Sequence, residues 1–223
     1  MSEDTDTGVA VRPYVAGDRD AVLRIAADTA LFGDPVEGFM EDRRLFCDIV
    51  YRYYVDLEPN SAWVAAAGGN VVGFLVGCVD TTKHDRIFWR HIVPRVALRL
   101  VGGVYRLGPR TFRYLAGLIA AGLRGEIPPV DLSSYPAHLH INLDAASRGR
   151  GAGGGLMNSY LSQLRHQGVE GVHLRTTSRN RAALHLYAKL GFQVLATRPT
   201  RLWASVVGGV VENLCFGLRL GEG

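Results

Sequence analysis

A run of glycines in one short segment constrains the fold of this 223-residue chain more than any other feature. The segment is Arg148-Gly-Arg-Gly-Ala-Gly-Gly-Gly155, and it follows a predicted strand and opens a predicted helix. Glycines at a helix start cost about 1 kcal/mol each relative to alanine, so a bound ligand explains them better than a plain turn. Glycine lets backbone N–H groups approach a ligand closely, and a helix N-terminus adds unpaired donors and a positive dipole end. The segment therefore predicts a pyrophosphate cradle.

Two nucleotide-binding patterns are alternatives for this loop. Gly149-x-Gly151-x-x-Gly154 matches the dinucleotide fingerprint, which expects a carboxylate about 20 residues further on, at the end of the next strand. That strand ends Leu174-Arg-Thr-Thr177 and has no carboxylate. The P-loop pattern fails because no Gly-Lys-Ser/Thr follows. An NADP-dependent oxidoreductase is kept as an alternative.

Hydrophobic periodicity divides the chain into strands and helices in alternation. Strands are expected near 9–14, 61–67, 71–79, 138–143, 172–176, 192–196 and 211–218, and helices near 18–30, 39–55, 153–166 and 180–190. This order predicts one α/β (α+β) domain over residues 8–223 with helices on both faces of a sheet. Residues 1–7 are expected to form a flexible tail.

Two motifs carry a resemblance to a known family. Arg148-x-x-Gly151-x-Gly153 resembles the acyl-CoA loop of the GNAT acetyltransferase superfamily. Asn180-x-x-Ala183-x-x-x-Tyr187-x-x-x-Gly191-Phe192 resembles the helix and strand that follow in that superfamily. The resemblance covers roughly residues 8–80 and 136–218. In addition, His138-Leu-His-Ile141 is similar to bacterial relatives of the acetyltransferase-like domain found in O-GlcNAc hydrolases.

The resemblance implies a mixed, mostly antiparallel sheet of about six to seven strands, splayed between residues 139–143 and 172–176. It implies acetyl-CoA as the co-substrate, with no metal. The pantetheine arm would contact the backbone at Leu143, Asp144 and Ala145, and also Asn180. The pyrophosphate would contact the loop residues, which are Arg148, Gly149, Arg150, Gly151, Ala152, Gly153 and Gly154.

The resemblance also implies a thiolate-side acid at Tyr187, although its helix face would bury a tyrosine in any case. Many members of the superfamily have a glutamate that acts as the general base at the position held here by Ala137. Nearby, His138, His140 and Asn142 share one face of a predicted central strand, where apolar side chains are the rule. Histidine suits a general base near neutral pH, so His140 and then His138 are candidates. An equal alternative is that both are core histidines whose ring nitrogens form hydrogen bonds within the protein.

The net charge of +4 hides an uneven distribution. Residues 1–80 carry 6 basic and 14 acidic side chains, whereas residues 83–124 carry 9 basic and 1 acidic. Residues 81–135 are too long for an ordinary connection between strands, and apolar residues recur at four-residue spacing from Phe88 to Leu100. We expect a helical insertion at 81–135 that caps the domain or covers the acceptor site. Alternative roles for the insertion are a dimer contact or a contact with the anionic surface of a membrane or a nucleic acid.

Composition narrows the class of protein further. A hydrophobic content of 48% excludes a mostly disordered chain. Cys47, Cys78 and Cys215 have neither disulfide-scaffold nor zinc spacing, which suggests free thiols in a reducing compartment. Arginines interrupt every apolar stretch of about 20 residues, so no transmembrane segment is expected, and no secretory signal is seen. We expect a cytoplasmic protein without a nucleic-acid partner, and a homodimer is left open.

The sequence therefore predicts an acetyl-CoA-dependent N-acetyltransferase that moves an acetyl group to an amine of a small molecule or a protein by direct attack. A catalytically silent acyl-CoA-binding module is the alternative, because Ala137 replaces the usual glutamate. The identity of the acceptor and the length of the acyl chain lie beyond the sequence.

Overall fold

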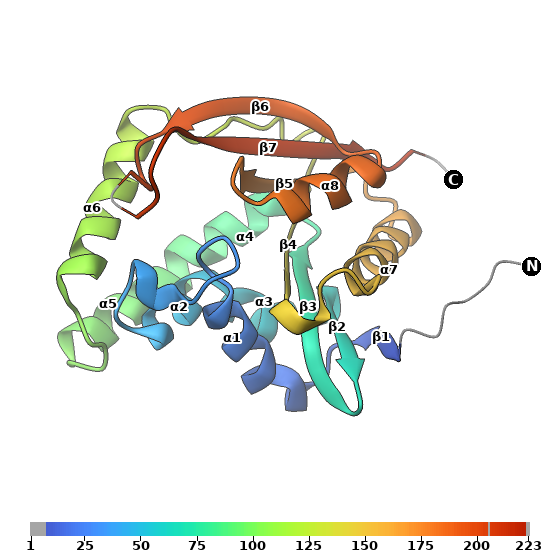
Figure 1. Cartoon of the computed structure of the whole chain (residues 1–223), viewed down its shortest axis with the longest axis horizontal. Helices are drawn as coiled ribbons and strands as arrows, with labels where there is room; N and C mark the ends of the chain where they lie inside the picture. Colours follow the sequence, from blue (N-terminus) through green and yellow to red (C-terminus); the bar gives the residue numbers. More distant parts are fainter. Residues whose placement is uncertain (1–7, 205, 222–223) are drawn as a thin grey trace, which may run out of the picture.

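A seven-stranded sheet with the order β1-β2-β3-β4-β5-β7-β6 organises the protein (Figure 1). The structure is a computed structural model that describes residues 8–204 and 206–221. The tail expected at residues 1–7 lies outside the described residues. The strands are β1 Val9–Pro13, β2 Ala62–Ala67, β3 Asn70–Cys78, β4 Ala137–Leu143, β5 Gly171–Thr177, β6 Gln193–Thr200 and β7 Val211–Arg219.

The direction of the strands confirms a mixed, mostly antiparallel sheet. Among the strands described, β4 and β5 form the one parallel pair, and the other neighbours are antiparallel. The β2–β3 hairpin turns at Gly68 and Gly69, whose φ angles of 54° and 82° favour glycine. This topology differs from the parallel doubly wound sheet that binds dinucleotides.

The sheet opens between β4 and β5. These strands pair at Ala137 with Val172 and at His138 with His173. Beyond this point β4 continues its ladder with β3 as far as Leu143, while β5 continues its ladder with β7. The two strands therefore diverge, and the expected splay is confirmed.

One face of the sheet is covered by helices from the N-terminal part of the chain. These are α1 Arg19–Asp28, α2 Arg43–Val50 and α3 Arg52–Leu57, with 3-10 turns at Ala16–Asp18, Val36–Gly38 and Pro59–Ser61. The single helix expected over residues 39–55 was wrong. Asp42 caps α2 by accepting from the Leu45 N–H at 2.9 Å. The helix is interrupted at Tyr51, whose ring packs against Phe74 and His140.

The opposite face carries α7 Ala152–His166 and α8 Arg181–Lys189, and a 3-10 turn at Ala145–Ser147 precedes α7. Two glycines of the loop allow α7 to approach its neighbours. A Cβ on Gly153 would lie 3.3 Å from the Leu143 side chain, and one on Gly155 would lie 3.0 Å from Val11. Close packing therefore explains part of the glycine run, for which the sequence favoured a bound ligand.

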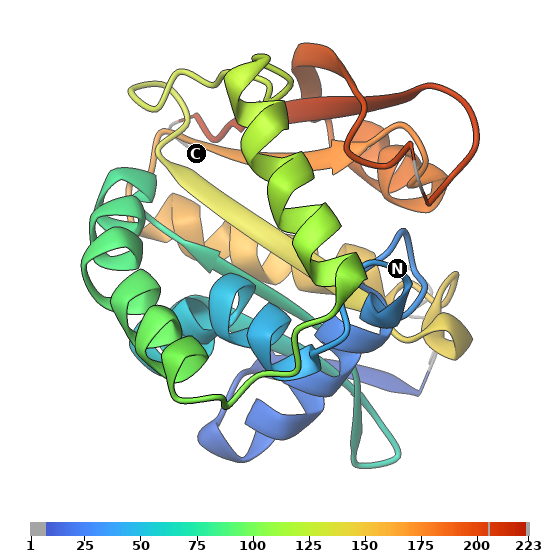
Figure 2. The same ribbon diagram turned by 90° about the vertical axis from the view of Figure 1, so that its left-hand side faces the viewer.

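The chain between β3 and β4 forms helices on one side of the molecule (Figure 2). They are α4 Thr81–Ile87, a π-helical turn at Phe88–Ile92, α5 Val93–Val101 and α6 Pro109–Leu123. Among the described residues, no helix is long and apolar enough to cross a membrane.

A buried tyrosine connects α7 to the centre of the sheet, and a substitution beside it can test this packing. The Tyr160 hydroxyl donates to the Cys78 and His138 carbonyl oxygens at 3.0 and 3.1 Å. A Cβ on Gly77 would meet that hydroxyl and lie 2.6 Å from the His138 carbonyl oxygen. We predict that Gly77→Ala lowers the free energy of unfolding by about 1–3 kcal/mol, measured by urea denaturation.

The matched control for this prediction is Gly122→Ala in α6, where a Cβ meets no atom within 4 Å. It should stabilise the protein by about 0.5–1 kcal/mol. Equal effects of the two substitutions would contradict the packing account.

Candidate active site

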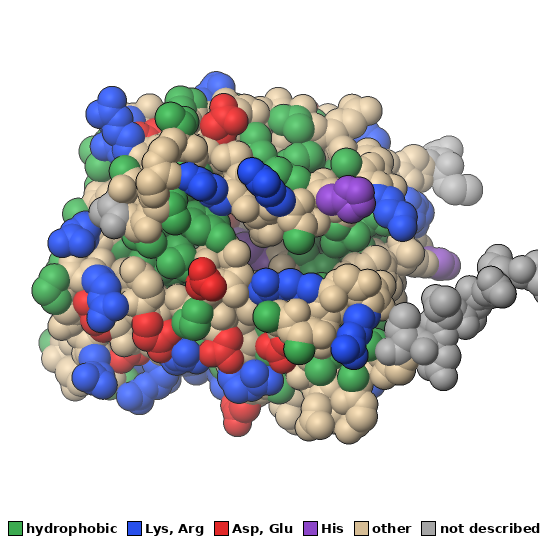
Figure 3. Space-filling model, viewed as in Figure 1, with side chains coloured by type: hydrophobic (Ala, Val, Ile, Leu, Met, Phe, Trp, Pro, Cys, Tyr) green, Lys and Arg blue, Asp and Glu red, His purple; other side chains and the backbone are tan. Residues whose placement is uncertain are grey.

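A cavity of about 190 Å³ lies at the splay. Its walls come from β4 (Leu139 to Asn142), the end of β5 (Arg175 to Thr177), Asn180, Tyr187 and, from the facing loops, residues 29–33 and Trp203. Figure 3 shows the molecule hollowed near the centre of this face, with histidine atoms visible in the depression. The divergence of β4 from β5 thus gives a ligand access to side chains of a central strand.

His140 lies in the wall of this cavity with its ring between two tyrosines. The Tyr51 and Tyr54 ring centroids are 5.7 and 5.4 Å from that of His140. Among the described residues, neither ring nitrogen of His140 has a hydrogen-bond partner. Burial, followed by the nearby His84 and His173, lowers the pKa of His140 to about 4. The imidazole is therefore neutral at physiological pH, with an acceptor nitrogen free for a ligand.

His138 has a different environment from His140. Its Nε2 lies 2.6 Å from the Tyr54 hydroxyl and its Nδ1 lies 2.8 Å from Thr81 Oγ1. Because Thr81 donates its own proton to the Pro136 carbonyl oxygen, His138 Nδ1 is the donor to Thr81, and Tyr54 donates to Nε2. Burial keeps the pKa of His138 well below its ordinary value. Both nitrogens are engaged, so this geometry favours a structural role for His138.

Asn142, the third polar residue of this strand face, belongs to a relay that sequence reasoning did not predict. Its Oδ1 accepts from the Tyr51 hydroxyl at 3.1 Å and its Nδ2 donates to Thr29 Oγ1 at 2.7 Å. Thr29 in turn donates to the Ile25 carbonyl oxygen. The relay ties β4 to α1 and to the turn between α2 and α3, and it holds Tyr51 against His140. No local pattern could reveal it, because its members lie far apart in sequence.

Tyr187, from α8, presents a hydroxyl to the same cavity. Its ring is buried against Phe192 and Phe216, with centroid distances of 5.9 and 5.6 Å. The hydroxyl has no hydrogen-bond partner in the part of the chain that the structure describes. Burial raises the pKa of Tyr187 above its ordinary value. The phenol therefore stays protonated and can donate a hydrogen bond to a ligand.

The free edge of β4 presents backbone groups to the splay. The Asp144 N–H donates to the Val72 carbonyl oxygen at 2.9 Å, on the β3 side. Because backbone groups alternate along an antiparallel ladder, those of Ile141 and Leu143 point toward the side that β5 has left. Leu143 thus remains available to a ligand, whereas the N–H of Asp144 is already used. The neighbouring Ala145 is exposed in a 3-10 turn.

The glycine loop lies directly beyond this edge. Gly149 and Gly151 have φ angles of 78° and 80°, and Gly151 caps α7 in the left-handed conformation. The first intrahelical bond runs from the Gly155 N–H to the Gly151 carbonyl oxygen, so the N–H groups of Ala152, Gly153 and Gly154 precede the helical ladder. Free donors at a helix start suit a phosphate.

The two arginines of the loop differ in their contacts. Arg148 donates to the Gly33 carbonyl oxygen at 3.3 Å, on the far rim of the cavity. Arg150 is exposed, and the described residues provide it with no ion pair. Both guanidinium groups can reorient toward an anion at the loop.

Two polar side chains between β5 and α8 complete the cavity. Asn180 caps α8 by accepting from the Ala183 N–H at 3.4 Å. Its amide nitrogen donates to no described residue. Thr177 Oγ1 is buried without a hydrogen-bond partner, which is costly unless a ligand or water completes it. These groups fit an amide-containing ligand that lies along the splay.

Aromatic rings form another part of the cavity wall. The Trp203 ring lies 5.1 Å from Phe32 and 5.7 Å from Tyr114 between centroids. Phe32 has a φ of 54°, a conformation that is uncommon for a bulky residue. We infer that the loop accepts this backbone conformation to hold the ring against Trp203.

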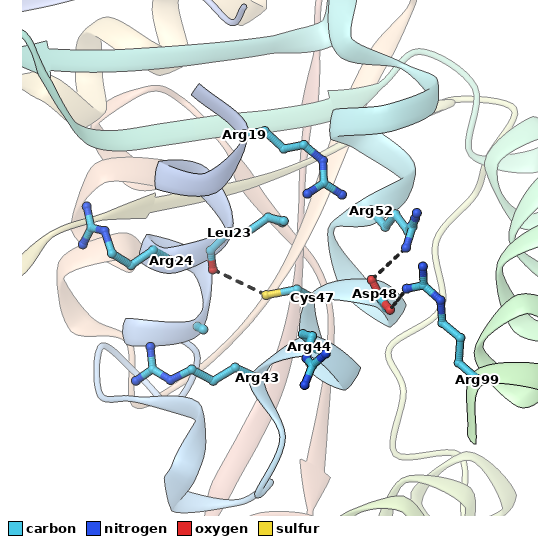
Figure 4. A pocket seen from close by; sticks show the side chains of 10 residues that line it. Arg19, Leu23, Arg24, Arg43, Arg44, Cys47, Asp48, Arg52 and Arg99 are labelled. Atoms are coloured by element: carbon cyan, nitrogen blue, oxygen red, sulfur yellow. Dashed lines mark hydrogen bonds and ion pairs between the residues drawn. The ribbon is translucent and has the colours of Figure 1, made fainter. Parts of the chain in front are cut away.

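A second cavity, of about 550 Å³, lies apart from the splay between α1, α2 and α5 (Figure 4). Most of the arginines that line it are paired with carboxylates, as in Arg19 with Asp56 and in Arg52 and Arg99 with Asp48. The buried Cys47 thiol donates to the Leu23 carbonyl oxygen. This cavity offers a network of ion pairs but no free acid or base, so the smaller cavity is the better candidate active site.

The described residues contain no group of three or more His, Cys, Asp or Glu side chains that could hold a metal ion. In the described part of the chain, His140 and Tyr187 are unpaired titratable side chains that line the cavity at the splay.

The chain is similar to several known proteins in sequence and fold. The model of the acetyltransferase (GNAT) family matches residues 113–192. The crystal structure of a protein called SsHAT is 34% identical, with a TM-score of 0.72, and the match covers 96% of this chain and 100% of that one. The polyamine N-acetyltransferase of Drosophila melanogaster is 18% identical, with a TM-score of 0.60 and coverages of 95% and 99%. The protein yncA of Salmonella typhimurium, solved with its cofactor acetyl-CoA, is 16% identical, with a TM-score of 0.55 and coverages of 97% and 96%.

The extent of these matches identifies the family. The match to SsHAT combines an identity above 30% with nearly full coverage of both chains, and the family model matches the region of the glycine loop and α8. The chain belongs to the GNAT acetyltransferase family, which confirms the resemblance seen in the sequence. The two structures that are less than 20% identical support the fold alone.

The lowered pKa of His140 has a consequence for stability. Because the unfolded chain binds a proton near pH 6.5 and the folded chain near pH 4, stability is complete above pH 6.5 and falls as pH drops toward 4. We predict that His140→Gln removes up to about 3 kcal/mol of this acid sensitivity, measured by urea denaturation at pH 7 and at about pH 4.5. The exposed His185→Gln is the control. Equal pH dependence in His140→Gln and wild type would contradict the burial of His140.

Proposed function

We propose that the protein is an N-acetyltransferase that moves the acetyl group of acetyl-CoA to an amine of a small molecule or a protein by direct attack. One observation carries the proposal: an unpaired neutral imidazole and an unpaired phenol, His140 and Tyr187, line the same cavity at the splay. Membership of the GNAT family supplies the reaction class.

The proposed binding mode of CoA follows the free donors of the splay. Its pyrophosphate would accept from the N–H groups of Gly151 to Gly154, with Arg148 and Arg150 contributing charge. The pantetheine arm would pair with the exposed backbone at Leu143 and Ala145. The Asn180 amide nitrogen and Thr177 Oγ1 are the side-chain groups left to bind its amides.

The state of the acceptor amine follows from the charges around the cavity. Among the described residues, Arg175 lines the cavity and no carboxylate does. An ammonium ion is disfavoured there, so the amine enters as the free base. A base with a pKa of about 4 could not deprotonate an ammonium with a pKa of about 10, because the transfer costs roughly 8 kcal/mol. His140 therefore accepts a proton only after the C–N bond has formed, when the attached nitrogen has become strongly acidic.

Tyr187 acts at the other end of the reaction. As the amine nitrogen bonds to the carbonyl carbon, the carbon–sulfur bond breaks and the thiolate leaves. A protonated phenol can donate a hydrogen bond or its proton to that sulfur. Trp203 and Phe32 would border the acceptor side, where aromatic faces can stabilise the positive charge that the amine nitrogen gains as the C–N bond forms.

A turnover assay tests the proposal. Acetyl-CoA mixed with the protein and a panel of primary amines should release the free thiol of CoA over many turnovers. Tyr187→Phe should lower kcat by roughly 10²-fold or more, within the range of general acid catalysis. The affinity for CoA, measured by calorimetry, should stay within about threefold of wild type.

A catalytically silent acyl-CoA-binding module would give the opposite result, with CoA binding and no thiol release above the uncatalysed rate. The alternative rests on Ala137, because an alanine side chain cannot act as a base. Ala137 is fully buried where β4 still pairs with β5. If CoA fails to bind at all, both hypotheses are wrong.

The pH dependence of the rate tests the role of His140. For an amine with a pKa of about 10, kcat/KM should rise about tenfold per unit between about pH 6 and 8, following the fraction of free amine. No break should occur near pH 6.5, because His140 is already neutral there. His140→Gln should lower the whole profile without changing its slope. A break near pH 6.5 that disappears in His140→Gln would show that His140 titrates normally and would overturn the proposed proton route.

A further inference from the structure

Helix α6 has an apolar face that nothing in the described structure covers. One side of the helix packs on the protein through Thr111, Tyr114 and Ala121. The opposite side carries Phe112, Ala116, Ile119 and Leu123, spaced at four, three and four residues, which places them in one stripe. Ile119 is 67% exposed and Leu123 is 86% exposed. A helix that is apolar on both sides is normally buried on both sides.

The π-helical turn and α5, on the same side of the molecule, carry further exposed apolar side chains. On α5, Leu98 and Val101 are 74% and 88% exposed, and Trp89 in the preceding π-helical turn is 69% exposed. Both α5 and α6 lie on the side of the molecule that faces the viewer in Figure 2. We name this surface, formed by Trp89, Leu98, Val101, Phe112, Ile119 and Leu123, the α5–α6 face.

The segment that contains the α5–α6 face is rich in arginines without partners. From Arg86 to Gly125 the sequence contains no Asp or Glu. The five arginines that form no ion pair or side-chain hydrogen bond with any described residue are Arg86, Arg90, Arg95, Arg106 and Arg113. The remaining three are paired, Arg99 with Asp48, Arg110 with Glu41 and Arg124 with Glu126.

One carboxylate beside this segment, Asp85, is exposed, whereas three others are buried and bonded within the protein. Asp48 is buried and also accepts from Tyr105. Asp42 is buried and accepts from the Leu45 and Arg106 backbone N–H groups. Glu126 is buried and accepts from Thr200. The segment that forms the α5–α6 face therefore carries both exposed apolar side chains and an excess of unpaired arginines.

We propose that the α5–α6 face docks peripherally on an anionic lipid bilayer. Apolar side chains on an interfacial helix enter the boundary between headgroups and acyl chains, while arginines bind the anionic headgroups. Trp89 suits that boundary, where indole rings concentrate. Docking of this kind needs no membrane-spanning helix.

Two other occupants fit the observations less well. A symmetric contact between two copies would bring the unpaired arginines of one copy against those of the other, and like charges repel. A nucleic acid would pair with the arginines. Interfaces with nucleic acids are polar, however, so Leu98, Ile119 and Leu123 would find no apolar partner there. An anionic bilayer satisfies both the charge and the apolar surface.

Vesicle co-sedimentation of the full chain tests the proposal. The protein should sediment with vesicles of phosphatidylcholine and phosphatidylglycerol, and much less with phosphatidylcholine alone. Higher salt should weaken binding, because it screens the arginines. Ile119→Ser combined with Leu123→Ser should lower the partition coefficient at least about tenfold. Arg90→Glu combined with Arg113→Glu should do the same.

Matched controls separate the α5–α6 face from general surface properties. Val15→Ser with Val210→Ser changes two exposed apolar residues elsewhere, and Arg165→Glu with Arg198→Glu makes the same change of charge elsewhere. Both control variants should bind vesicles like wild type. Melting temperatures within a few degrees of wild type show that the variants are folded.

Three results would overturn the proposal. The first is no sedimentation with the anionic vesicles. The second is undiminished binding by the folded Ile119→Ser, Leu123→Ser variant, which would leave charge alone as the cause, as for a nucleic acid. The third is a dimer of the wild-type chain, seen by light scattering, that the same variant converts to a monomer. That result would make the face an interface between copies.

Discussion

The early end of pairing between β4 and β5 is the constraint on which the site depends. After His138 and His173 the two strands separate, and each keeps its other neighbour. The separation frees the backbone of β4 at Ile141 and Leu143 and exposes His140, in the interior of the sheet, to a cavity. It also lets the start of α7 lie against Leu143, which places the free N–H groups of the glycine loop at the mouth of the splay. The proposed binding groups and reactive groups thus lie together because the β4–β5 ladder ends early.

The sequence could predict the parts of this arrangement that depend on local patterns. Glycines before an amphipathic helix indicate the loop, and hydrophobic periodicity indicates the strands of the sheet. The break at Tyr51 was missed, because it depends on contacts with Phe74, His140 and Asn142 from other strands. The different environments of His138 and His140 were also hidden. Tyr54 and Thr81 saturate one ring and leave the other free, and only the tertiary structure brings these residues together.

Burial has opposite effects on the pKa values of the two candidate reactive groups, His140 and Tyr187. Burial lowers the pKa of His140 and raises that of Tyr187, so near neutral pH one is a free acceptor and the other a donor. Arg175 and the lack of a lining carboxylate among the described residues favour a neutral amine. On another side of the molecule, the segment of α5 and α6 combines unpaired arginines with exposed apolar side chains. We propose a different role for arginine there from the one proposed for Arg175 in the cavity.

The central claim is that the thioester of acetyl-CoA lies in the splay between His140 and Tyr187. A crystal structure of the protein with CoA tests it most directly. The account predicts that the sulfur lies within hydrogen-bond distance of the Tyr187 hydroxyl, with pantetheine amides paired to the β4 backbone at Leu143 and the pyrophosphate at Gly151 to Gly154. CoA bound elsewhere, or in the splay with its sulfur beyond the reach of Tyr187, would contradict it.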